Sequence, residues 1–342
     1  MGDPSGIGPE VVVKALSKLS LYRRCKPLII GDVRVIKNAV EICNLQIKIN
    51  PVKKVNDSLF LPGTLDVLDL ANFNKNPEYG KVTAASGSAA FESVEKVIKL
   101  ALNGEIDATV TAPINKEAIN MAGHSFSGHT EIYAFYTKTK NYAMLLVYKN
   151  LRVIHVSTHI SLRQACDMVR KERILKVIGL LHDACRDFGI TDPRIAVAGL
   201  NPHSGENSLF GWEEEREIMP AVSEALLSGY NVEGPIPADT MFSKALGGQF
   251  DGCVAMYHDQ GHIPLKLLGF RWNKTVNRMD VRGVNITLGL PIIRVSVDHG
   301  TAFDLAGRGL ASEESMTVSI DYAIKMAKSR IKNTYSKSIS EH

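Results

Sequence analysis

Several features are scarce or absent in this chain of 342 residues. Its five cysteines are scattered, odd in number and never spaced as CxxC, which excludes a disulfide scaffold. No apolar run approaches the roughly 18 residues that a membrane-spanning helix needs, and no charged-then-apolar leader opens the chain. Neither sign of charge dominates, with 40 Lys and Arg against 36 Asp and Glu. We therefore expect a cytoplasmic protein that binds neither membranes nor nucleic acid.

What is present is a hydrophobic content of 45%, enough for one large or two ordinary domains, each with its own core. Short apolar runs alternate with amphipathic segments, a pattern typical of α/β proteins. The expected strands cover residues 27–31, 108–111, 143–148, 151–157, 194–198, 251–256 and 292–297. The expected helices cover 33–43, 86–103, 172–188, 211–227 and 312–335.

A glycine-rich loop, Gly2–Glu10, opens the chain directly before a helix that begins near Pro9. Free backbone N–H groups at such a helix start suit an anion. The loop lacks the GK[ST] of a phosphate-binding P-loop and the spacing of a GxGxxG dinucleotide motif. A tight strand-to-helix turn is an equal alternative.

Three histidines, His159, His203 and His258, each follow a predicted strand. In open α/β sheets ligands bind beyond the carboxyl ends of strands, and three imidazoles can hold a divalent transition metal. The alternative is that they are ordinary loop histidines bonded to backbone. Asp239 and Asp259 lie in similar loops and could be further ligands, acceptors that orient an imidazole, or proton-transfer groups.

Other residues suit an anionic ligand. His129 and Thr130 follow Gly128 at the start of a predicted helix, where a phosphate or carboxylate can bind, although a simple cap by Ser127 or Thr130 is equally consistent. Arg294 lies inside an apolar strand, where its guanidinium needs an anion, either a bound phosphate or a structural ion-pair partner. Two further polar residues in apolar contexts are Lys266 and Asn285.

These motifs together resemble the 4-hydroxythreonine-4-phosphate dehydrogenase family of vitamin B6 biosynthesis. The resemblance runs from Gly2 to about Ala327. It rests on GDPSGIGPE (2–10), TAPINKEA (111–118), GHTE (128–131), THISLRQA (158–165), GLNPHSGE (199–206), PADT (237–240), YHDQGH (257–262), GVNITLGLPIIR (283–294) and DHGTAFDLAGRG (298–309).

The resemblance implies a three-layer α/β/α subunit of two domains, similar in fold to isocitrate and isopropylmalate dehydrogenases. We expect residues 1–128 with 299–342 to form the first domain, and residues 129–298 the second. The second domain would carry the metal ligands and a homodimer interface, and the active site would lie in the interdomain cleft.

The resemblance also implies roles for individual residues. The metal ligands, shared between the subunits of the dimer, are His159, His203 and His258. The substrate-binding residues are His129, Thr130, Lys266, Asn285 and Arg294. Segment 299–309 is similar to a nucleotide-side loop, with His299, Gly300, Asp304 and Gly307 as cofactor-binding residues. The candidates for proton handling are Asp239, Asp259 and Lys266.

The implied reaction is the oxidation, by NAD or NADP, of the 3-hydroxyl of 4-phosphooxy-L-threonine, followed by decarboxylation to 3-amino-2-oxopropyl phosphate. One divalent ion, Zn, Mg or Co, would assist it. The same chemistry on 4-phospho-threonate, on the erythronate analogue, on another hydroxy acid or on an aromatic dihydrodiol is the nearest alternative. A phosphate-ligand binding protein without catalysis and a phosphate acyltransferase-like protein are alternatives of other classes.

Two departures from the family pattern stand out. The family begins with a strand before the glycine loop, and none precedes Gly2 here, so we expect Met1 to be an internal methionine of a longer natural chain. Residues 271–280 read as an insertion between Lys266 and Asn285, either a lid over the pocket or a longer surface hairpin.

Overall fold

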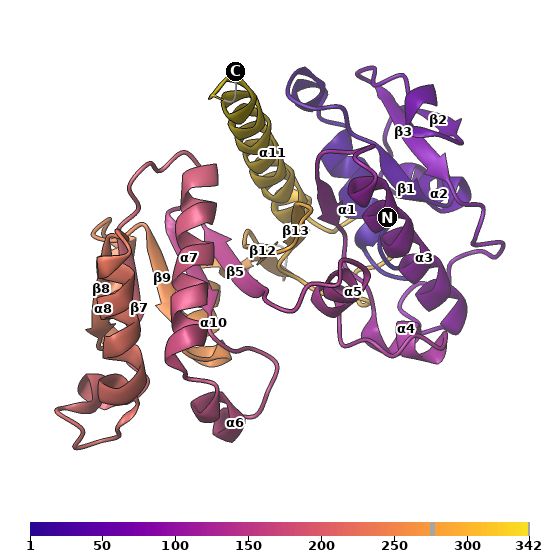
Figure 1. Ribbon diagram of the computed structural model, residues 1–342. Coiled ribbons are helices and arrows are strands. Elements are labelled where there is room, and N and C mark those ends of the chain that lie inside the picture. Colours follow the sequence, from indigo (N-terminus) through magenta and orange to yellow (C-terminus); the bar gives the residue numbers. More distant parts are fainter. Residues whose placement is uncertain (274–277, 341–342) are drawn as a thin grey trace. The chain divides into compact units, whose positions relative to one another are not determined.

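The alternating apolar and amphipathic segments form the α/β structure that the sequence predicts (Figure 1). The computed structural model describes residues 1–273 and 278–340, and the side chains outside 271–280 and 333–340. Contacts divide the chain into two units. Unit 1 comprises Met1–Lys140 and Leu290–Ile324, and unit 2 comprises Asn141–Gly289 and Lys325–His342.

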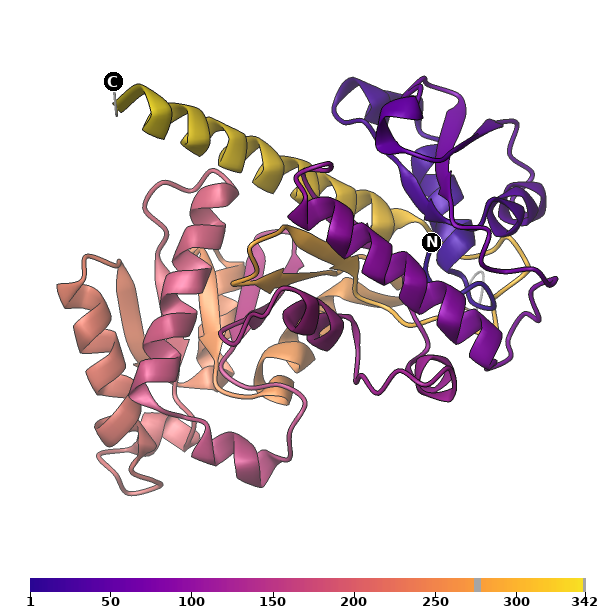
Figure 2. The ribbon, with the colours of Figure 1, turned by 45° about the vertical axis from the view of Figure 1, so that its right-hand side comes forward.

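Unit 1 contains a parallel three-stranded sheet between two layers of helices. On one face, Leu65 and Val67 pack with helices α1 and α2, and on the other Leu68 packs with Leu100 of α3, which Figure 2 shows along its length. The period-2 alternation of a strand puts these neighbours on opposite faces. In sheet order the strands are β1 (Ile29–Gly31), β3 (Thr64–Asp69) and β2 (Lys48–Val52), and the helices are α1 (Gly8–Leu16), α2 (Val33–Ile42) and α3 (Ala84–Leu102).

A second part of unit 1 is built on two parallel strands, β4 and β13, which pair from Arg294 opposite Thr109 to Ser296 opposite Thr111. Two short helices follow β4, and the first residues of the final helix complete the unit. The elements are β4 (Thr109–Thr111), β13 (Arg294–Val297), α4 (Lys116–Met121), α5 (His129–Tyr136) and α11 (Glu314–Ser340).

The glycine-rich opening loop of unit 1 is a tightly packed turn. The Gly6 N–H donates to the Asp3 carbonyl, and the Ile7 N–H donates to the Thr301 carbonyl. A Cβ at Gly2 would lie 2.6 Å from the Pro113 carbonyl oxygen, and one at Gly6 would lie 2.9 Å from the Thr301 side chain. The glycines therefore allow the loop to pack closely against its neighbours. This agrees with the tight turn that the sequence analysis gave as the alternative to an anion-binding loop.

Unit 2 is built on a mixed sheet with the order β12-β5-β6-β9-β7-β8. Strands β5 and β6 form the predicted hairpin, and β6, β9, β7 and β8 run parallel to one another. The bounds are β5 (Ala143–Tyr148), β6 (Leu151–His155), β7 (Ile195–Ala198), β8 (Val232–Ile236), β9 (Gly252–Ala255) and β12 (Val284–Leu288).

Helices cover both faces of this sheet, so unit 2 also has three layers. Gly252 of β9 faces Leu181 of α7, whereas its neighbour Cys253 packs in one cluster with Met241 of α9 and Leu265 of α10. The helices are α6 (Leu162–Asp167), α7 (Lys171–Asp187), α8 (Met219–Leu227), α9 (Ala238–Leu246) and α10 (His258–Gly269). No helix in the described ranges combines the length and the apolar character needed to cross a membrane.

Some predicted elements have bounds that differ from those in the structure. The helix expected over 211–227 begins only at Glu214, as a π-helical turn to Ile218, and becomes α-helical at Met219. Pro220 lies in the first turn of α8, a position that a residue without an N–H tolerates. In the insertion at 271–280, β10 (Phe270–Asn273) pairs antiparallel with β11 (Arg278–Val281). Residues 274–277 lie outside the described residues, so the lid stays a prediction.

Candidate functional site

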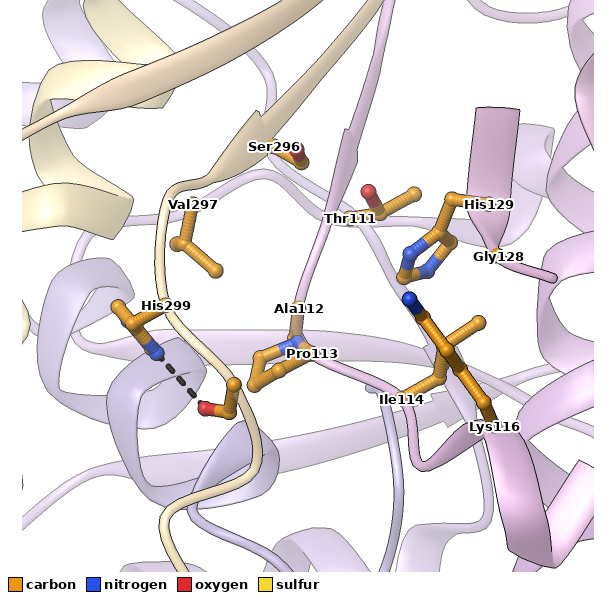
Figure 3. A pocket seen from close by; sticks show the side chains of 11 residues that line it. Thr111, Ala112, Pro113, Ile114, Lys116, Gly128, His129, Ser296, Val297 and His299 are labelled. Carbon is orange, nitrogen blue, oxygen red and sulfur yellow. Dashed lines mark hydrogen bonds between the residues drawn. The ribbon is translucent and has the colours of Figure 1, made fainter. Parts of the chain in front are cut away.

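A cavity of about 180 Å³ lies in unit 1, where β4 and β13 end (Figure 3). Because the two strands are parallel, their carboxyl ends meet at one edge, the usual position of a ligand in an open α/β sheet. Its wall includes Thr111 and Lys116 after β4, His129 at the start of α5, and Ser296 and His299 at the end of β13. We call this the anion pocket.

His129 is the first residue of α5 and lies in this wall. Burial holds the pKa of its imidazole well below 6.5, and nearby Arg294 and Lys116 act in the same direction, so the ring is neutral at pH 7. Its Nε2 atom is buried and makes no hydrogen bond to the described residues. Gly128 is the N-cap of α5 and makes no side-chain cap hydrogen bond. The positive end of a helix dipole at this position favours an anion.

Arg294 supplies a buried cation next to the pocket. Its side chain is on β13, only 3% exposed, and Nη2 donates to Thr111 Oγ1 over 3.2 Å. The guanidinium also lies 5.8 Å from the centre of the Tyr133 ring. Burial lowers the pKa of Arg294 to about 10, with Tyr133 and Glu131 counteracting that shift, so the group remains charged at pH 7.

Lys116 is a charged pocket residue to which the sequence analysis gave no role. The side chain of Asn115 accepts a hydrogen bond from the Ala118 N–H, and this cap starts α4 at Lys116 beside the pocket. Figure 3 shows its amine next to the His129 ring. The signal was in the sequence, because Lys116 belongs to a Pro- and Asn-containing loop directly after a strand.

The predicted cofactor residues lie in two places. His299 and Gly300 line the anion pocket, and burial lowers the pKa of His299. Gly307 lies elsewhere in the loop, where its N–H donates to Glu10 Oε1 over 2.7 Å and a Cβ would lie 2.6 Å from the Tyr79 ring. Asp304 is exposed.

A second group of predicted residues lies in unit 2. His159, His203 and His258 follow β6, β7 and β9, and β9 pairs with both other strands in parallel. All three histidines therefore start from one edge of the sheet, as the sequence predicts. We call these three residues the histidine edge. The rings of His159 and His258 lie 5.8 Å apart between centroids, and His258 Nδ1 lies 2.6 Å from Asp259 Oδ1.

The histidine edge provides part of the ligand set of a metal ion. Within the described residues, no three side chains of His, Cys, Asp or Glu are grouped closely enough to hold one. The donor chemistry nevertheless fits. Two imidazoles that share an ion through bonds of about 2.1 Å have ring centroids roughly 5–6 Å apart, close to the separation of His159 and His258. A carboxylate on the second ring nitrogen, as Asp259 provides, orients and strengthens a ligating histidine.

The remaining predicted residues are spread over unit 2. Asp239 is in the first turn of α9, directly after β8 and so near the same sheet edge. Lys266 lies eight residues after His258 on α10, roughly 12 Å along the helix, with its amine 5.5 Å from the centre of the Phe270 ring. Asn285 is on β12, where its Nδ2 lies 2.9 Å from Met144 Sδ. The structure thus does not group Lys266 with His258.

Comparison with known proteins identifies relatives along almost the whole chain. The family model described as "Pyridoxal phosphate biosynthetic protein PdxA" matches residues 23–323. The D-threonate 4-phosphate dehydrogenase of Cupriavidus necator is 46% identical over 331 residues, covering 96% of each chain. The crystal structure of a 4-hydroxythreonine-4-phosphate dehydrogenase from Klebsiella pneumoniae is 44% identical, with a TM-score of 0.82, covering 96% of this chain and 98% of that one.

A more distant relative has another named substrate. The structure of a terephthalate 1,2-cis-dihydrodiol dehydrogenase from Burkholderia xenovorans is 28% identical, with a TM-score of 0.65, covering 95% of this chain and 96% of that one. The names of these relatives thus agree on dehydrogenases and differ in substrate. By the extent of the family match and the identity to these relatives, the chain belongs to the PdxA family of pyridoxal phosphate biosynthetic proteins.

Proposed function

We propose that this dehydrogenase oxidises a small hydroxy acid that carries a terminal phosphate, and that the anion pocket of unit 1 binds that phosphate. One observation carries the proposal: Lys116 and the start of α5 line the pocket where β4 and β13 end, and the buried Arg294 side chain, from the first position of β13, reaches Thr111 in the same wall. A phosphate accepts several hydrogen bonds at once and pairs well with a guanidinium.

D-threonate 4-phosphate is the first substrate candidate, because the Cupriavidus necator relative, at 46% identity, is named for it. The sequence analysis put 4-phosphooxy-L-threonine first, and it remains the second candidate because the Klebsiella pneumoniae relative is named for that compound. The two substrates differ at C2, which carries a hydroxyl in the first and an amino group in the second. In both, oxidation at C3 produces a 3-oxo acid that can lose CO2.

The residues of unit 1 would bind and orient the substrate. Arg294 remains charged at pH 7 and is held by Thr111 and Tyr133, so its guanidinium can meet an anion without reorganising. Lys116 adds a second positive charge at the pocket wall. The neutral His129 offers its unbonded Nε2 atom as a hydrogen-bonding group that carries no charge.

The residues of unit 2 would hold a divalent ion, with His159 and His258 as one pair and His203 as the third ligand. Such an ion supplies a Lewis acid that stabilises negative charge on the reacting oxygen. The carboxylate of Asp259 would keep the His258 ring oriented through Nδ1. Asp239, at the start of α9, is the candidate to move a proton, because it lies near the same sheet edge.

We further propose NAD or NADP as the oxidant and a homodimer as the working assembly. The nicotinamide supplies the hydride acceptor. His299, Gly300 and Gly307 would form its binding loop, and Glu10 holds that loop through the Gly307 N–H. The nucleotide proposal rests on the resemblance of segment 299–309 to nucleotide-side loops, and the homodimer rests on the resemblance to the family.

The experiment that tests this proposal is the reduction of NAD+ and of NADP+ by the purified protein. The assay contains Zn2+, Mg2+ or Co2+ and either D-threonate 4-phosphate or 4-phosphooxy-L-threonine. We expect turnover with both and the higher kcat/KM with D-threonate 4-phosphate. A preference for the aminated substrate would return the assignment to vitamin B6 biosynthesis. No turnover with either substrate would refute the proposal and favour a protein that only binds phosphorylated ligands.

A further inference from the structure

The loop that carries His203 has an unusual backbone. It leaves β7 after Ala198 and reaches the π-helical turn at Glu214. From His203 to Ser208 every residue has a positive φ, and in this run only Gly205 is glycine. A left-handed conformation costs an L-residue roughly 1–2 kcal/mol. Local preferences therefore do not hold this loop, and contacts with the rest of unit 2 must do so.

Glu214 makes those contacts. Its side chain is only 3% exposed, and its Oε1 accepts hydrogen bonds from the backbone N–H groups of Leu200 and Asn201, both over 2.7 Å. Its Oε2 accepts a third bond, from Asn201 Nδ2 over 2.9 Å. Hydrogen bonds to an ionised carboxylate are shorter and about twice as strong as neutral ones. One buried carboxylate thus fixes the base of the loop, two residues before His203.

The glycines of the loop pack directly against this carboxylate. A Cβ at Gly205 would lie 2.8 Å from Glu214 Oε2, and one at Gly199 would lie 3.2 Å from Glu214 Oε1. Cβ atoms essentially never come within 3.0 Å of another heavy atom, so a side chain at position 205 would displace the Glu214 carboxylate. Hydrogen bonds and close packing therefore point independently to the same group.

We propose that Glu214 is a positioning residue for the metal site. It holds the start of the His203 loop at the sheet edge from which His159 and His258 also begin, and it thereby presents His203 to the ion. The inference rests on the proposed function, because it takes the histidine edge as the metal site. Glu214 itself does not touch the ion. Gln260 Nε2 also donates to the Gly199 carbonyl over 2.8 Å, but Glu214 alone accepts from the backbone N–H groups of both Leu200 and Asn201.

The test is zinc affinity, measured with the full-length protein by competition against a chromogenic chelator. Loss of a group that orients a ligand costs typically 10–100-fold in metal affinity. We expect that loss in Glu214→Ala. We expect a smaller loss in Glu214→Gln, which keeps one oxygen for the two backbone N–H groups and replaces the other by a donor that faces the Asn201 amide. His203→Ala sets the scale of losing the ligand itself.

The matched control is Glu224→Gln on α8, in the same unit. Glu224 pairs with Lys171 on the surface, and its side chain is 46% exposed. We expect the zinc affinity of Glu224→Gln to equal that of the unchanged protein. Circular dichroism and thermal unfolding accompany each titration, which is run well below the midpoint of unfolding.

The outcomes separate the inference from the function on which it rests. If the unchanged protein binds zinc no better than His203→Ala does, the metal site itself is refuted. If His203→Ala loses zinc but folded Glu214→Ala and Glu214→Gln bind it normally, the positioning role is overturned. A lower unfolding temperature with unchanged affinity also overturns it, because a merely structural residue behaves in that way. Should Glu214→Ala fail to fold, Glu214→Gln decides alone.

Discussion

The anion pocket of unit 1 and the histidine edge of unit 2 are built on the same plan, but only the first forms a complete site within the described residues. Both use segments that follow the carboxyl ends of parallel strands. In unit 1 these segments enclose a cavity with Lys116 and His129 in its wall. In unit 2 His159 and His258 are close, but no complete metal-binding group is present among the described side chains.

The difference follows from how far each functional side chain lies from its strand. In unit 1 the chain passes from β4 to the first residue of α4 in five residues, and Arg294 is part of a strand. Strand and helix backbones set the positions of those side chains almost by themselves. In unit 2 His203 belongs to a loop of left-handed residues, held by Glu214. A site made from such loops depends on anchors outside it.

The largest effect is expected from His203→Ala. The variant should lose nearly all turnover and bind less metal while the fold stays intact, because His203 is exposed and no core contact is removed. Metal content after purification without chelator and NAD+ reduction give the two readouts. Unchanged activity of the parent protein in metal-free buffer would contradict the role of the histidine edge.

The next effect concerns the buried cation of unit 1. Arg294→Met should raise KM for the phosphorylated substrate by about 10–100-fold, the value of one or two charge-assisted hydrogen bonds. Steady-state kinetics measures it, and Met fills much of the volume left by the arginine. An equal loss of affinity for NAD would show instead that Arg294 supports the fold of unit 1.

A smaller effect is expected from Lys116→Ala. Lys116 is exposed at the pocket wall, so water screens its charge more than that of Arg294. We expect a rise in KM of about 3–10-fold, stronger at low salt than at high salt. Lys99→Ala, which removes only a surface pair with Glu95 in the same unit, is the control and should leave KM unchanged. A salt-independent effect would contradict an electrostatic role.

The smallest expected effect is on the pH dependence of stability, to which one buried titratable group in each unit contributes. Burial lowers the pKa of His155, in unit 2, to about 4. The unfolded chain protonates this imidazole below about pH 6.5, whereas the folded chain does so only below about pH 4. The stability that is present above pH 6.5 is therefore lost as the pH falls. From pH 7 to pH 5 the free energy of unfolding of the parent protein should fall by about 2 kcal/mol more than that of His155→Asn. Denaturant unfolding at the two pH values measures this difference.

Asp3, in unit 1, should give the opposite sign. Burial raises its pKa to about 6 from 3.8, so the neutral form is favoured in the fold and its stabilising effect is lost as pH rises through 6. Going from pH 7 to pH 5 should stabilise the parent protein by about 1 kcal/mol relative to Asp3→Asn. The same sign for both variants would show that pH acts on the two units through other groups.

The sequence predicted the class of fold and the place of most candidate residues. The hairpin over 143–148 and 151–157 and the positions of His159, His203 and His258 after strands are confirmed, because apolar runs and polar strand-end loops are local signals. The parallel pairing that puts β6, β9 and β7 side by side is not a local signal, and the sequence analysis did not predict it.

Other features could not be predicted from the sequence. Glu214 is one of three consecutive glutamates, 213–215, and nothing in the pattern marks it as the buried one. The left-handed run at 203–208 contains only one glycine, so turn chemistry gives no warning of it. The helix expected from 211 begins only at Glu214, in the π-helical turn that also carries the bond to the Leu200 N–H.

The central claim is that unit 1 binds the phosphate of the substrate and unit 2 binds the metal that assists its oxidation. Its most direct test measures kcat and KM for NAD+ reduction with D-threonate 4-phosphate and with unphosphorylated D-threonate, each with added metal and with chelator. The account predicts that removing the phosphate raises KM steeply and that chelation abolishes kcat. Equal turnover of the unphosphorylated acid, or full kcat in chelator, would contradict it.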